Sequence, residues 1–504
     1  MGLGPMHGGL ERAAAEQGER QAIRSPDGSW TFLQLDRWAG ALAGTLAASG
    51  VAPGTRVAVL MANRVEVVVA VHAVSKLGGA TVLLSPAWKA AEVGPALALT
   101  GPAHAVADAD GTALLAGLLG RAHITDVDDP AVGALAEGGP GPGPRRVAPD
   151  DEAVLVFSSG TTGLPKAVRH THRTIGHATA HWVEALGLGP DDRFQIATPP
   201  SHILGLLNLL AAMEARASVR LHRRFDLDEV LRCVERDRVT LEMAVAPIAL
   251  AMANHPRLED FDLSSLRYVM WGATPVTEHV ARTVTARTGV RWLPAYGASE
   301  VPVIACNPVD RPDAWRLDSA GLPPAGVELR VVDIESGAPL PAGGIGEIQV
   351  RSPSRMVGYL PDEATAEAVV DGWYRTGDVG YLEPEGWVHL TDRVKEMIKV
   401  NGFQVAPAEI EAVLLGHPAV LDCAVFGVAD ERTGEAPVAA VQLDPVATVS
   451  EGELQRLVAD TLATYKQLRH VLVVDAVPRL PSGKVLRRTL RDEWAPTLTG
   501  ATRP

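Results

Sequence analysis

The stretch SSGTTGLPK (158–166) follows directly on the apolar run Ala153–Phe157, and together they decide the fold. The run has the length and composition of a buried strand. Glycine, serine and threonine dominate the loop, so its N–H groups and hydroxyls can surround phosphate oxygens, and Lys166 adds a positive charge. It is not a Walker A loop, because the Gly-Lys-Ser/Thr ending is absent and Pro165 precedes the lysine. The alternative interpretation is a surface turn after a strand.

Helical and extended segments alternate on the N-terminal side of this loop. Apolar residues at helical spacing predict helices over 32–48 and 65–77, and short apolar runs predict strands over 57–61 and 80–84. Such alternation is typical of parallel strands joined by crossover helices, so we expect an α/β fold here. Glycine and proline predict a loop over 137–149.

The pattern changes near Val327. Short strands separated by glycine and proline are predicted over 328–332, 347–350 and 387–390, which indicates a small β-rich subregion. The last hundred residues contain enough segments for a separate α+β domain, with predicted elements over 408–415, 421–428, 438–443, 451–462 and 470–474. We expect at least two cores, because 504 residues exceed one ordinary domain.

Composition and charge exclude several classes of protein. The chain is 47% hydrophobic and 21% charged, as in a globular protein, and its formal net charge of −14 argues against nonspecific nucleic-acid binding. Cys233, Cys306 and Cys423 have no pair spacing, so neither a disulfide scaffold nor a thiolate zinc site is predicted. Residues 1–16 lack a signal-peptide pattern, and the apolar stretch His202–Met213 is too short for a membrane span. We expect a cytoplasmic protein with no membrane partner.

Further motifs follow the loop in a fixed order: WGATP (271–275), YGASE (296–300), YRTGD (374–378), DRVKEMIKVNGFQVAPAEIE (392–411) and PSGKVLRR (481–488). With SSGTTGLPK they resemble the adenylate-forming superfamily of acyl-CoA synthetases, luciferases and peptide-synthetase adenylation domains. GFQVAPAEIE (402–411) and TYKQLRHV (464–471) look closest to 4-coumarate:CoA ligases. The resemblance covers nearly the whole chain.

The resemblance implies two domains. A large N-terminal domain over 1–394 would combine parallel αβ layers with the small β-rich subregion, and a small mobile α+β domain over 395–504 would follow. The family's hinge falls at Lys395. Rotation there would allow one active site to serve two half-reactions.

The resemblance also implies a nucleotide site and a metal. Thr161, Thr162 and Lys166 would hold the phosphates, Tyr296 would lie against adenine and Asp378 would bind the ribose hydroxyls. Glu300 would bind Mg²⁺. The full predicted nucleotide set is Ser158, Ser159, Gly160, Thr161, Thr162, Gly163, Lys166, Gly272, Ala273, Thr274, Tyr296, Gly297, Ser299, Asp378, Arg393 and Lys399.

Three residues are predicted to be catalytic. In the family, the lysine at Lys484 enters the site during adenylation and contacts the reacting oxygens, while Lys166 acts from the phosphate loop. His202, in PPSHILG, matches the place of an aromatic or histidine residue beside the acyl tunnel; the alternative is a packed, hydrogen-bonded histidine. The histidines near residue 175 (His170, His172, His177 and His181) do not predict a zinc site, because a general base and a third ligand are missing.

Several departures leave the acid and the acceptor open. Pro294 and Ala295 stand where Gln and Gly are usual, and Asn401 stands where close plant relatives carry Lys. The segment VPVIACNP (301–308) differs from a typical coumarate ligase at the predicted acid wall, which is expected around His202, 271–275 and 301–304.

The predicted reaction is ATP-dependent activation of a small carboxylic acid to acyl-AMP, followed by thioester formation with coenzyme A. The acid would be aryl, cinnamate-like or medium-chain. A carrier-protein thiol, an amine, or an ATP- and nitrite-dependent diazotase reaction on an amino-aryl acid are alternatives. A degenerate nucleotide sensor is a third hypothesis, against which the intact Lys166, Glu300, Asp378, Arg393 and Lys484 argue.

Overall fold

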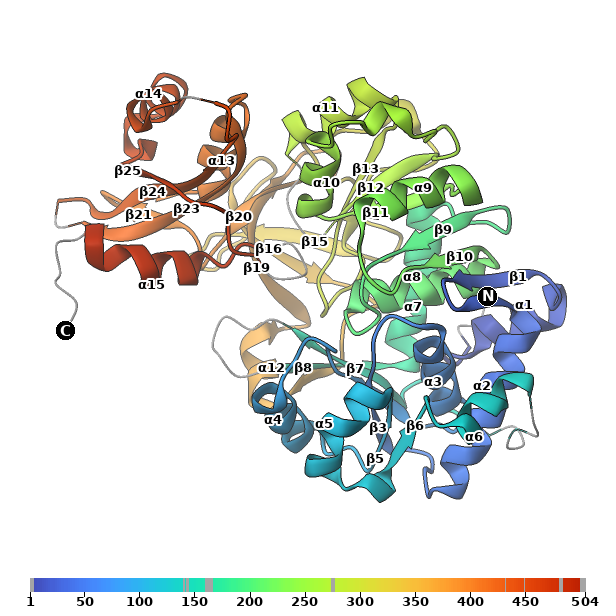
Figure 1. Ribbon diagram of the computed structural model, residues 1–504. Coiled ribbons are helices and arrows are strands. Elements are labelled where there is room, and N and C mark those ends of the chain that lie inside the picture. Colours follow the sequence, from blue (N-terminus) through green and yellow to red (C-terminus); the bar gives the residue numbers. More distant parts are fainter. Residues whose placement is uncertain are drawn as a thin grey trace.

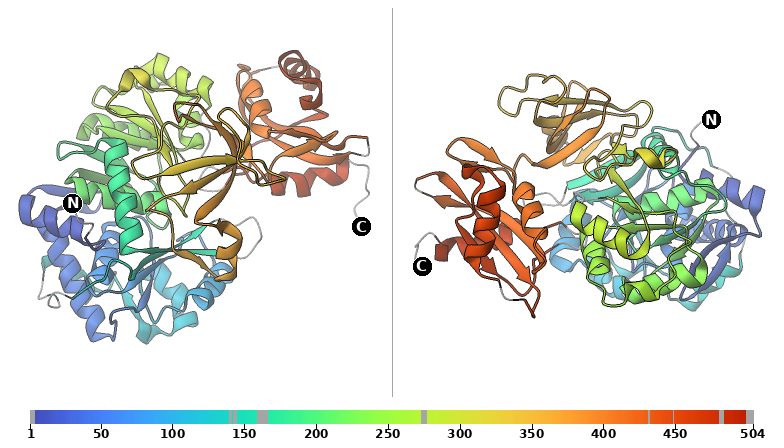
Figure 2. Two further views of the ribbon diagram at one scale, coloured as in Figure 1. Left: turned by 180° about the vertical axis from the view of Figure 1, so that it is seen from behind. Right: turned by 90° about the horizontal axis from the view of Figure 1, so that it is seen from above.

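The computed structural model describes residues 4–138, 141, 145–158, 166–272, 277–430, 432–447, 449–479 and 484–498. Two mostly parallel sheets with antiparallel strands at their edges, called the parallel sheets below, make up the fold together with an antiparallel sheet and a C-terminal part. The C-terminal elements, drawn in orange and red, lie to one side of the rest (Figure 1). The view from above shows the same separation (Figure 2).

The first parallel sheet contains the strand before the phosphate loop. Its seven strands are ordered β17-β8-β7-β4-β3-β5-β6, and β3 pairs in parallel with β4 and β5. Helices α3 (Val65–Lys76), α4 (Ala90–Thr100) and α5 (Ala109–Leu119) connect its parallel strands. The strands are β3 (Arg56–Leu60), β4 (Ala80–Leu83), β5 (His104–Ala107), β6 (Ile124–Asp126), β7 (Glu152–Ser158), β8 (Lys166–Thr171) and β17 (Gly358–Leu360). The predicted α/β alternation is confirmed, with boundaries shifted by one residue.

The N-terminal hairpin forms one edge of the second sheet. Its order is β14-β13-β12-β11-β9-β10-β1-β2, and β1 pairs in parallel with β10. The sequence patterns did not predict this pairing. The strands are β1 (Gln21–Ser25), β2 (Gly28–Thr31), β9 (Arg193–Ile196), β10 (Ser218–Leu221), β11 (Leu241–Ala244), β12 (Tyr268–Trp271), β13 (Trp292–Tyr296) and β14 (Ala305–Cys306).

Helices α7 and α8 lie between the two parallel sheets (Figure 1). Helix α8 is apolar on nearly every side, because it packs in the hydrophobic cluster that both sheets share. Helix α2 spans Phe32–Ala48 as predicted, since a capping box between Thr31 and Gln34 fixes its start. The other helices here are α1 (Gly8–Gln17), α6 (Pro130–Gly133), α7 (His172–Leu186), α8 (Ile203–Ala215), α9 (Leu227–Asp237), α10 (Ala246–Ala253) and α11 (Glu278–Thr288).

The predicted β-rich subregion is an antiparallel sheet. Its order is β15-β16-β19-β18, and β20 pairs with β19. It comprises β15 (Glu328–Val332), β16 (Gly346–Arg351), β18 (Val369–Val370), β19 (Trp373–Leu382) and β20 (Val388–Arg393), with α12 (Glu363–Ala368) before β18. Asp378 and Arg393 face each other across β19 and β20.

The C-terminal part has hydrophobic cores of its own. Two clusters contain only residues from Ile398 onward. The elements are β21 (Ile398–Val400), β22 (Phe403–Val405), α13 (Pro407–Leu415), β23 (Val420–Asp430), β24 (Gly434–Leu443), α14 (Glu451–Thr461), β25 (His470–Val473) and α15 (Arg487–Leu498). The sequence patterns did not predict α15, whose polar surface carries a weak apolar stripe. The predicted fold class, a large α/β domain with a β-rich subregion before a small α+β domain, is confirmed.

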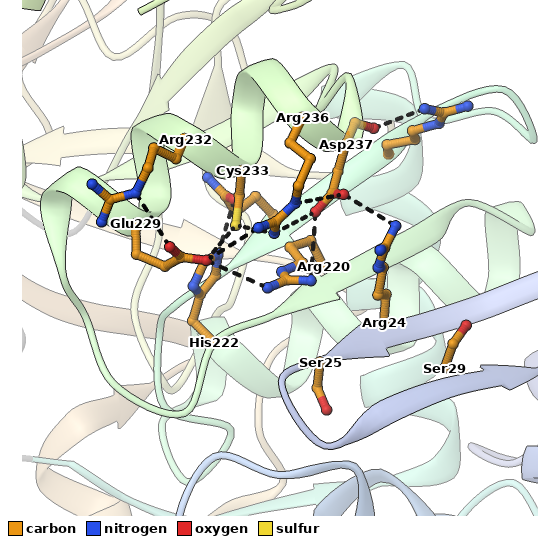
Figure 3. A network of polar contacts seen from close by, with 12 residues as sticks. Arg24, Ser25, Ser29, Arg220, His222, Glu229, Arg232, Cys233, Arg236 and Asp237 are labelled. Carbon is orange, nitrogen blue, oxygen red and sulfur yellow. Dashed lines mark hydrogen bonds and ion pairs between the residues drawn. The ribbon is translucent and has the colours of Figure 1, made fainter.

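A polar network ties the N-terminal hairpin to α9 (Figure 3). The Asp237 carboxylate forms ion pairs with Arg24 at 3.1 Å, Arg220 at 3.5 Å and Arg236 at 3.1 Å. Arg24 lies on β1 and Arg220 on β10, so one carboxylate joins two strands and a helix. The side chains of Arg220 and Asp237 are largely buried, which makes their mutual pairing necessary.

Beneath α9, a second polar group is sealed inside the protein. Glu242 on β11 is 2% exposed, and its Oε2 accepts a hydrogen bond from Gln195 Nε2 at 2.5 Å. Gln195 Oε1 in turn lies 2.9 Å from His222 Nε2. Burial raises the pKa of Glu242 to about 8, so the carboxyl is largely protonated at neutral pH.

We expect Glu242→Gln to remove a pH-dependent loss of stability. The folded pKa is raised, so stability from this group is complete below about pH 4.5 and falls as pH rises toward about 8. The melting temperature of the Gln variant should gain on that of the unmodified chain between pH 5.5 and 8, because the difference in their free energies of unfolding grows by up to ~1.4 kcal/mol per pH unit. Scanning fluorimetry of both proteins measures the difference. A constant difference across this range would refute the assignment.

Within the described ranges, no helix combines the length and the apolar content that spanning a membrane requires. The three cysteines are buried free thiols. The predicted loop over 137–149 lies partly outside the described residues.

Candidate functional site

A cavity of about 1690 Å³ lies where the two parallel sheets, the antiparallel sheet and the C-terminal part meet. Most of its wall comes from the ends of strands and the loops that follow them. In α/β sheets, ligands bind in crevices at this edge. Lys484 reaches the same cavity from the C-terminal part.

The structure brings most predicted site residues to this cavity. Those that line it are Ser158, Lys166, His202, Gly272, Tyr296, Gly297, Ser299, Glu300, Arg393, Lys395 and Lys484. Gly297 has no room for a side chain, because a Cβ there would lie 2.1 Å from the Pro302 carbonyl oxygen. The YGASE turn therefore needs glycine at this position.

Some predicted residues are elsewhere or are not described. Ser159, Gly160, Thr161, Thr162, Gly163, Ala273 and Thr274 lie outside the described residues. Lys399 is exposed on β21 and does not line the cavity, and its backbone N–H donates to Glu435 Oε2 at 2.7 Å. Its predicted contact with nucleotide stays a prediction.

Asp378 connects two residues of the cavity wall. Its Oδ2 accepts a hydrogen bond from the Tyr296 hydroxyl at 2.5 Å, and its Oδ1 pairs with Arg393 Nε at 3.0 Å. Burial raises the pKa of Asp378, while the guanidinium of Arg393 opposes that shift. Tyr296 and Arg393 line the cavity, and Asp378 lies directly behind them. The carboxylate thus fixes both side chains, and its predicted contact with ribose stays a prediction.

Lys484 lies near the same group. Burial lowers the pKa of its ammonium, and the positive charge of Arg393 lowers it further, whereas Glu396 and Asp378 raise it. Two cations, Arg393 and Lys484, therefore face one end of the cavity. Such an end is suited to an anion that neutralises both.

Glu300 and Lys166 are joined by a residue that the sequence patterns did not single out. Glu300 is 7% exposed, and its Oε1 accepts a hydrogen bond from the Tyr359 hydroxyl at 2.6 Å. The ammonium of Lys166 lies 5.5 Å from the centre of the Tyr359 ring. Tyr359 comes from β17, which pairs with β8 just after the phosphate loop. No local motif marks this tyrosine, since only strand pairing brings it here.

A second part of the cavity is apolar. We call it the apolar recess: Trp182, Ile203, Leu204, Leu207 and Met270 line it and pack in one hydrophobic cluster. None of the five carries a charge. The recess suits a hydrocarbon or aromatic group rather than a second carboxylate.

His202 lies beside the apolar recess and also begins helix α8. It is the N-cap residue, and its Nδ1 accepts a hydrogen bond from the Leu204 N–H at 3.3 Å. Burial lowers the pKa of the imidazole below its usual value, so the ring is neutral at pH 7. The structure supports both interpretations of the sequence, a residue at the cavity and a hydrogen-bonded histidine.

The predicted acid wall requires a correction. Trp271 is 1% exposed and packs on Trp292 at 5.1 Å between ring centres, away from the cavity. Side chains alternate along a strand, so Met270 faces the cavity and Trp271 the opposite side. Val301, Val303 and Ile304 are likewise core residues, and only Pro302 of that segment lines the cavity.

Two histidines of the α7 region, His170 and His172, have hydrogen-bond partners in the fold. His170 Nε2 bonds the Ser299 carbonyl oxygen at 2.8 Å, and His172 Nδ1 accepts the Met6 N–H at 3.0 Å. Among the described residues, no group of three His, Cys, Asp or Glu side chains is arranged to hold a metal ion.

Comparison with known proteins adds the decisive observation. The model of the AMP-binding enzyme family matches residues 10–360, and that of the AMP-binding enzyme C-terminal domain matches 409–484. The chain belongs to the AMP-binding enzyme family. This confirms the predicted membership of the adenylate-forming superfamily and the predicted enzyme class, an AMP-forming acid–CoA ligase.

Several relatives of this AMP-binding enzyme cover nearly its whole length. 4-Coumarate–CoA ligase 5 of Oryza sativa subsp. japonica is 34% identical over 97% of this chain and 95% of its own. The amide bond synthetase McbA from Marinactinospora thermotolerans is 33% identical with a TM-score of 0.88, over 97% of this chain and 100% of that one. The anthranilate CoA ligase AuaEII, solved with anthranoyl-AMP, is 26% identical with a TM-score of 0.91, over 100% and 99%.

For this AMP-binding enzyme, we expect Asp378→Ala to raise the KM for ATP by about tenfold to a hundredfold. The change leaves Arg393 and Tyr296 without their shared acceptor and removes the carboxylate predicted to bind ribose. The KM for the acid should change little. Steady-state pyrophosphate release measures both constants.

Asp310→Ala serves as the control, because this exposed carboxylate does not line the cavity. An unchanged KM for ATP in folded Asp378→Ala protein would contradict the predicted contact of Asp378 with the ribose of ATP.

Proposed function

We propose that this chain activates an aryl or similar apolar monocarboxylic acid with ATP and transfers the acyl group to coenzyme A in the cytoplasm. The observation that carries the proposal is one cavity with a cationic end and an apolar recess. An acid placed there has its tail in the recess and its carboxylate toward Lys484 and Arg393. In the first half-reaction, a carboxylate oxygen attacks the α-phosphorus of ATP, and the bond to the β-phosphate oxygen breaks with release of pyrophosphate.

Lys484 and Arg393 provide the charge that this first step needs. Negative charge builds on the phosphoryl oxygens and the leaving pyrophosphate, and cations already in position stabilise it. Lys166, at the start of β8, places a third cation beside the phosphate loop.

Glu300 fits a role in holding Mg²⁺. Its carboxylate is buried at the cavity wall, and the Tyr359 hydroxyl fixes Oε1 at 2.6 Å. Mg²⁺ in nucleotide sites usually combines one or two carboxylates with phosphate oxygens and water. When bound, Mg²⁺ neutralises charge on the phosphates. Tyr359 would hold the carboxylate in the orientation that such an ion requires.

The second half-reaction requires access for a thiol. The coenzyme A thiolate attacks the acyl carbon, the bond to the AMP oxygen breaks, and AMP leaves. We propose that residues 395–504 rotate about a hinge at Lys395 between the steps, which withdraws Lys484 from the cavity. Separate hydrophobic clusters in this part support its movement as a unit.

An amine acceptor is the second candidate. The similarity to the amide bond synthetase McbA, at 33% identity over 97% of this chain, favours it. In that reaction the amine attacks the same acyl carbon, AMP leaves, and an amide forms. The adenylation step is common to both candidates.

A product analysis separates these candidates. The protein is incubated with ATP, Mg²⁺, coenzyme A and a pool of aromatic and fatty acids, and the products are identified by mass spectrometry. An acyl-CoA together with AMP supports the ligase proposal and identifies the acid. AMP without thioester moves the acceptor elsewhere, and amines, a carrier protein, or nitrite with amino-aryl acids are then added. No AMP with any acid would contradict the proposal.

We expect Lys484→Ala to slow adenylation by about a hundredfold or more while largely sparing thioester formation from supplied acyl-AMP, because its ammonium acts only on the phosphoryl transfer. Arg488→Ala is the matched control, since it removes an exposed cation four residues further on. Pyrophosphate release and thioester formation are measured separately. Equal losses in both half-reactions, with the fold intact, would show that the role is wrong.

A further inference from the structure

Trp182 is the large aromatic side chain of the apolar recess. It comes from α7, is 3% exposed and lines the cavity. The other four residues of the recess are Ile203, Leu204, Leu207 and Met270, which are aliphatic or thioether side chains. Trp182 is therefore the one flat surface among the five.

The polar atom of Trp182 is turned away from the cavity. Its indole Nε1–H donates to Asn208 Oδ1 at 2.8 Å, and Asn208 is fully buried and does not line the cavity. The ring therefore presents only carbon atoms to a ligand. Only 3% of the residue is exposed, so a substrate tail would meet a small area of aromatic carbon and no hydrogen-bond donor of this ring.

Asn208 is itself held in one orientation. Its Nδ2–H₂ group donates to the sulfur of Met243 at 3.4 Å, which leaves Oδ1 for the indole. Met243 Sδ also accepts from the Thr198 hydroxyl at 3.7 Å. This chain links α7, α8 and β11, so the ring plane of Trp182 is set by residues from three elements.

We propose that Trp182 selects acids with a flat aromatic tail and that Asn208 is the positioning residue that fixes its ring. The inference rests on the proposed function and names the substrate class of the same site. A buried indole always needs a partner for its N–H, and that requirement alone explains the hydrogen bond. The exposure of the ring carbons to the cavity adds the selective role, because aromatic pairs are stabilised beyond the burial of their area.

The test compares two acids that differ in whether the terminal ring is aromatic and flat or saturated and puckered. 3-Phenylpropanoate and 3-cyclohexylpropanoate have the same carbon skeleton, but only the first has an aromatic ring. We expect Trp182→Leu to lower the ratio of their kcat/KM values by about threefold to tenfold, with the KM for ATP unchanged. This ratio does not depend on how much of the protein is active, so partial unfolding cannot produce the effect. Trp373→Leu is the control, because Trp373 packs between Arg330 and Arg351 and does not line the cavity.

Asn208 is tested through the residue that it positions. Asn208→Leu should lower the same ratio in the protein with Trp182, because the indole loses its acceptor. In a Trp182→Phe background the ratio should be insensitive to Asn208→Leu, since phenylalanine has no N–H to hold. A change of equal size in both backgrounds would show that Asn208 does not act through Trp182.

The outcomes separate the two proposals. If the unmodified protein releases pyrophosphate with these acids but Trp182→Leu leaves the ratio unchanged, the selective role of Trp182 is overturned and the proposed function stands. If the unmodified protein activates neither these acids nor any other in the pool, the proposed function fails and this inference fails with it.

Discussion

The carboxylate of Asp378 is the constraint around which the site is organised. It accepts from Tyr296 at the end of the second sheet and pairs with Arg393 on the neighbouring strand of the antiparallel sheet. Lys484, from the C-terminal part, lies close enough for the charge of Asp378 to raise the pKa of its ammonium. Burial makes this negative charge costly, so the carboxylate is stable there only while cations and donors surround it. The Asp378 carboxylate thereby joins the second sheet, through Tyr296, to the antiparallel sheet, through Arg393, at the cavity wall.

The two ends of the cavity follow opposite physical rules. At the cationic end, Arg393 and Lys484 are close enough to repel each other, which favours an anionic ligand between them. In the apolar recess, burial disfavours charge and keeps His202 neutral. An amphipathic acid satisfies both ends at once, with its charged group at one and its tail at the other. The large difference in environment across one cavity therefore orients the substrate.

Local sequence patterns predicted the helices and strands well. They did not predict the contacts between residues that are distant in the sequence. The bounds of α2 and of β15 follow from periodicity and local capping, and they were predicted without error. The motifs placed Lys166, Glu300 and Lys484 in the cavity wall, because each lies in one short segment, but they contain a minority of the lining residues. The partners of these residues were not predictable: Tyr359 is 59 residues from Glu300, Asn208 is 26 from Trp182, and Asp378 is 82 from Tyr296. Trp271 was misplaced, because a motif gives the position of a residue but not the side of the strand that it faces.

The parallel pairing of β1 with β10 has a consequence for the order of folding during synthesis. Ile23 and Val219 are partners in this pairing, so the first strand leaves the ribosome well before its partner exists. At typical rates of synthesis, the delay is roughly 10–40 s. Throughout that interval, the Arg24 guanidinium has no Asp237 to pair with, and one edge of the hairpin is open to other chains. Chaperone protection during translation is thus most valuable for the first thirty or so residues, whose hairpin reaches the cavity wall through the ion pair of Asp27 with Arg223.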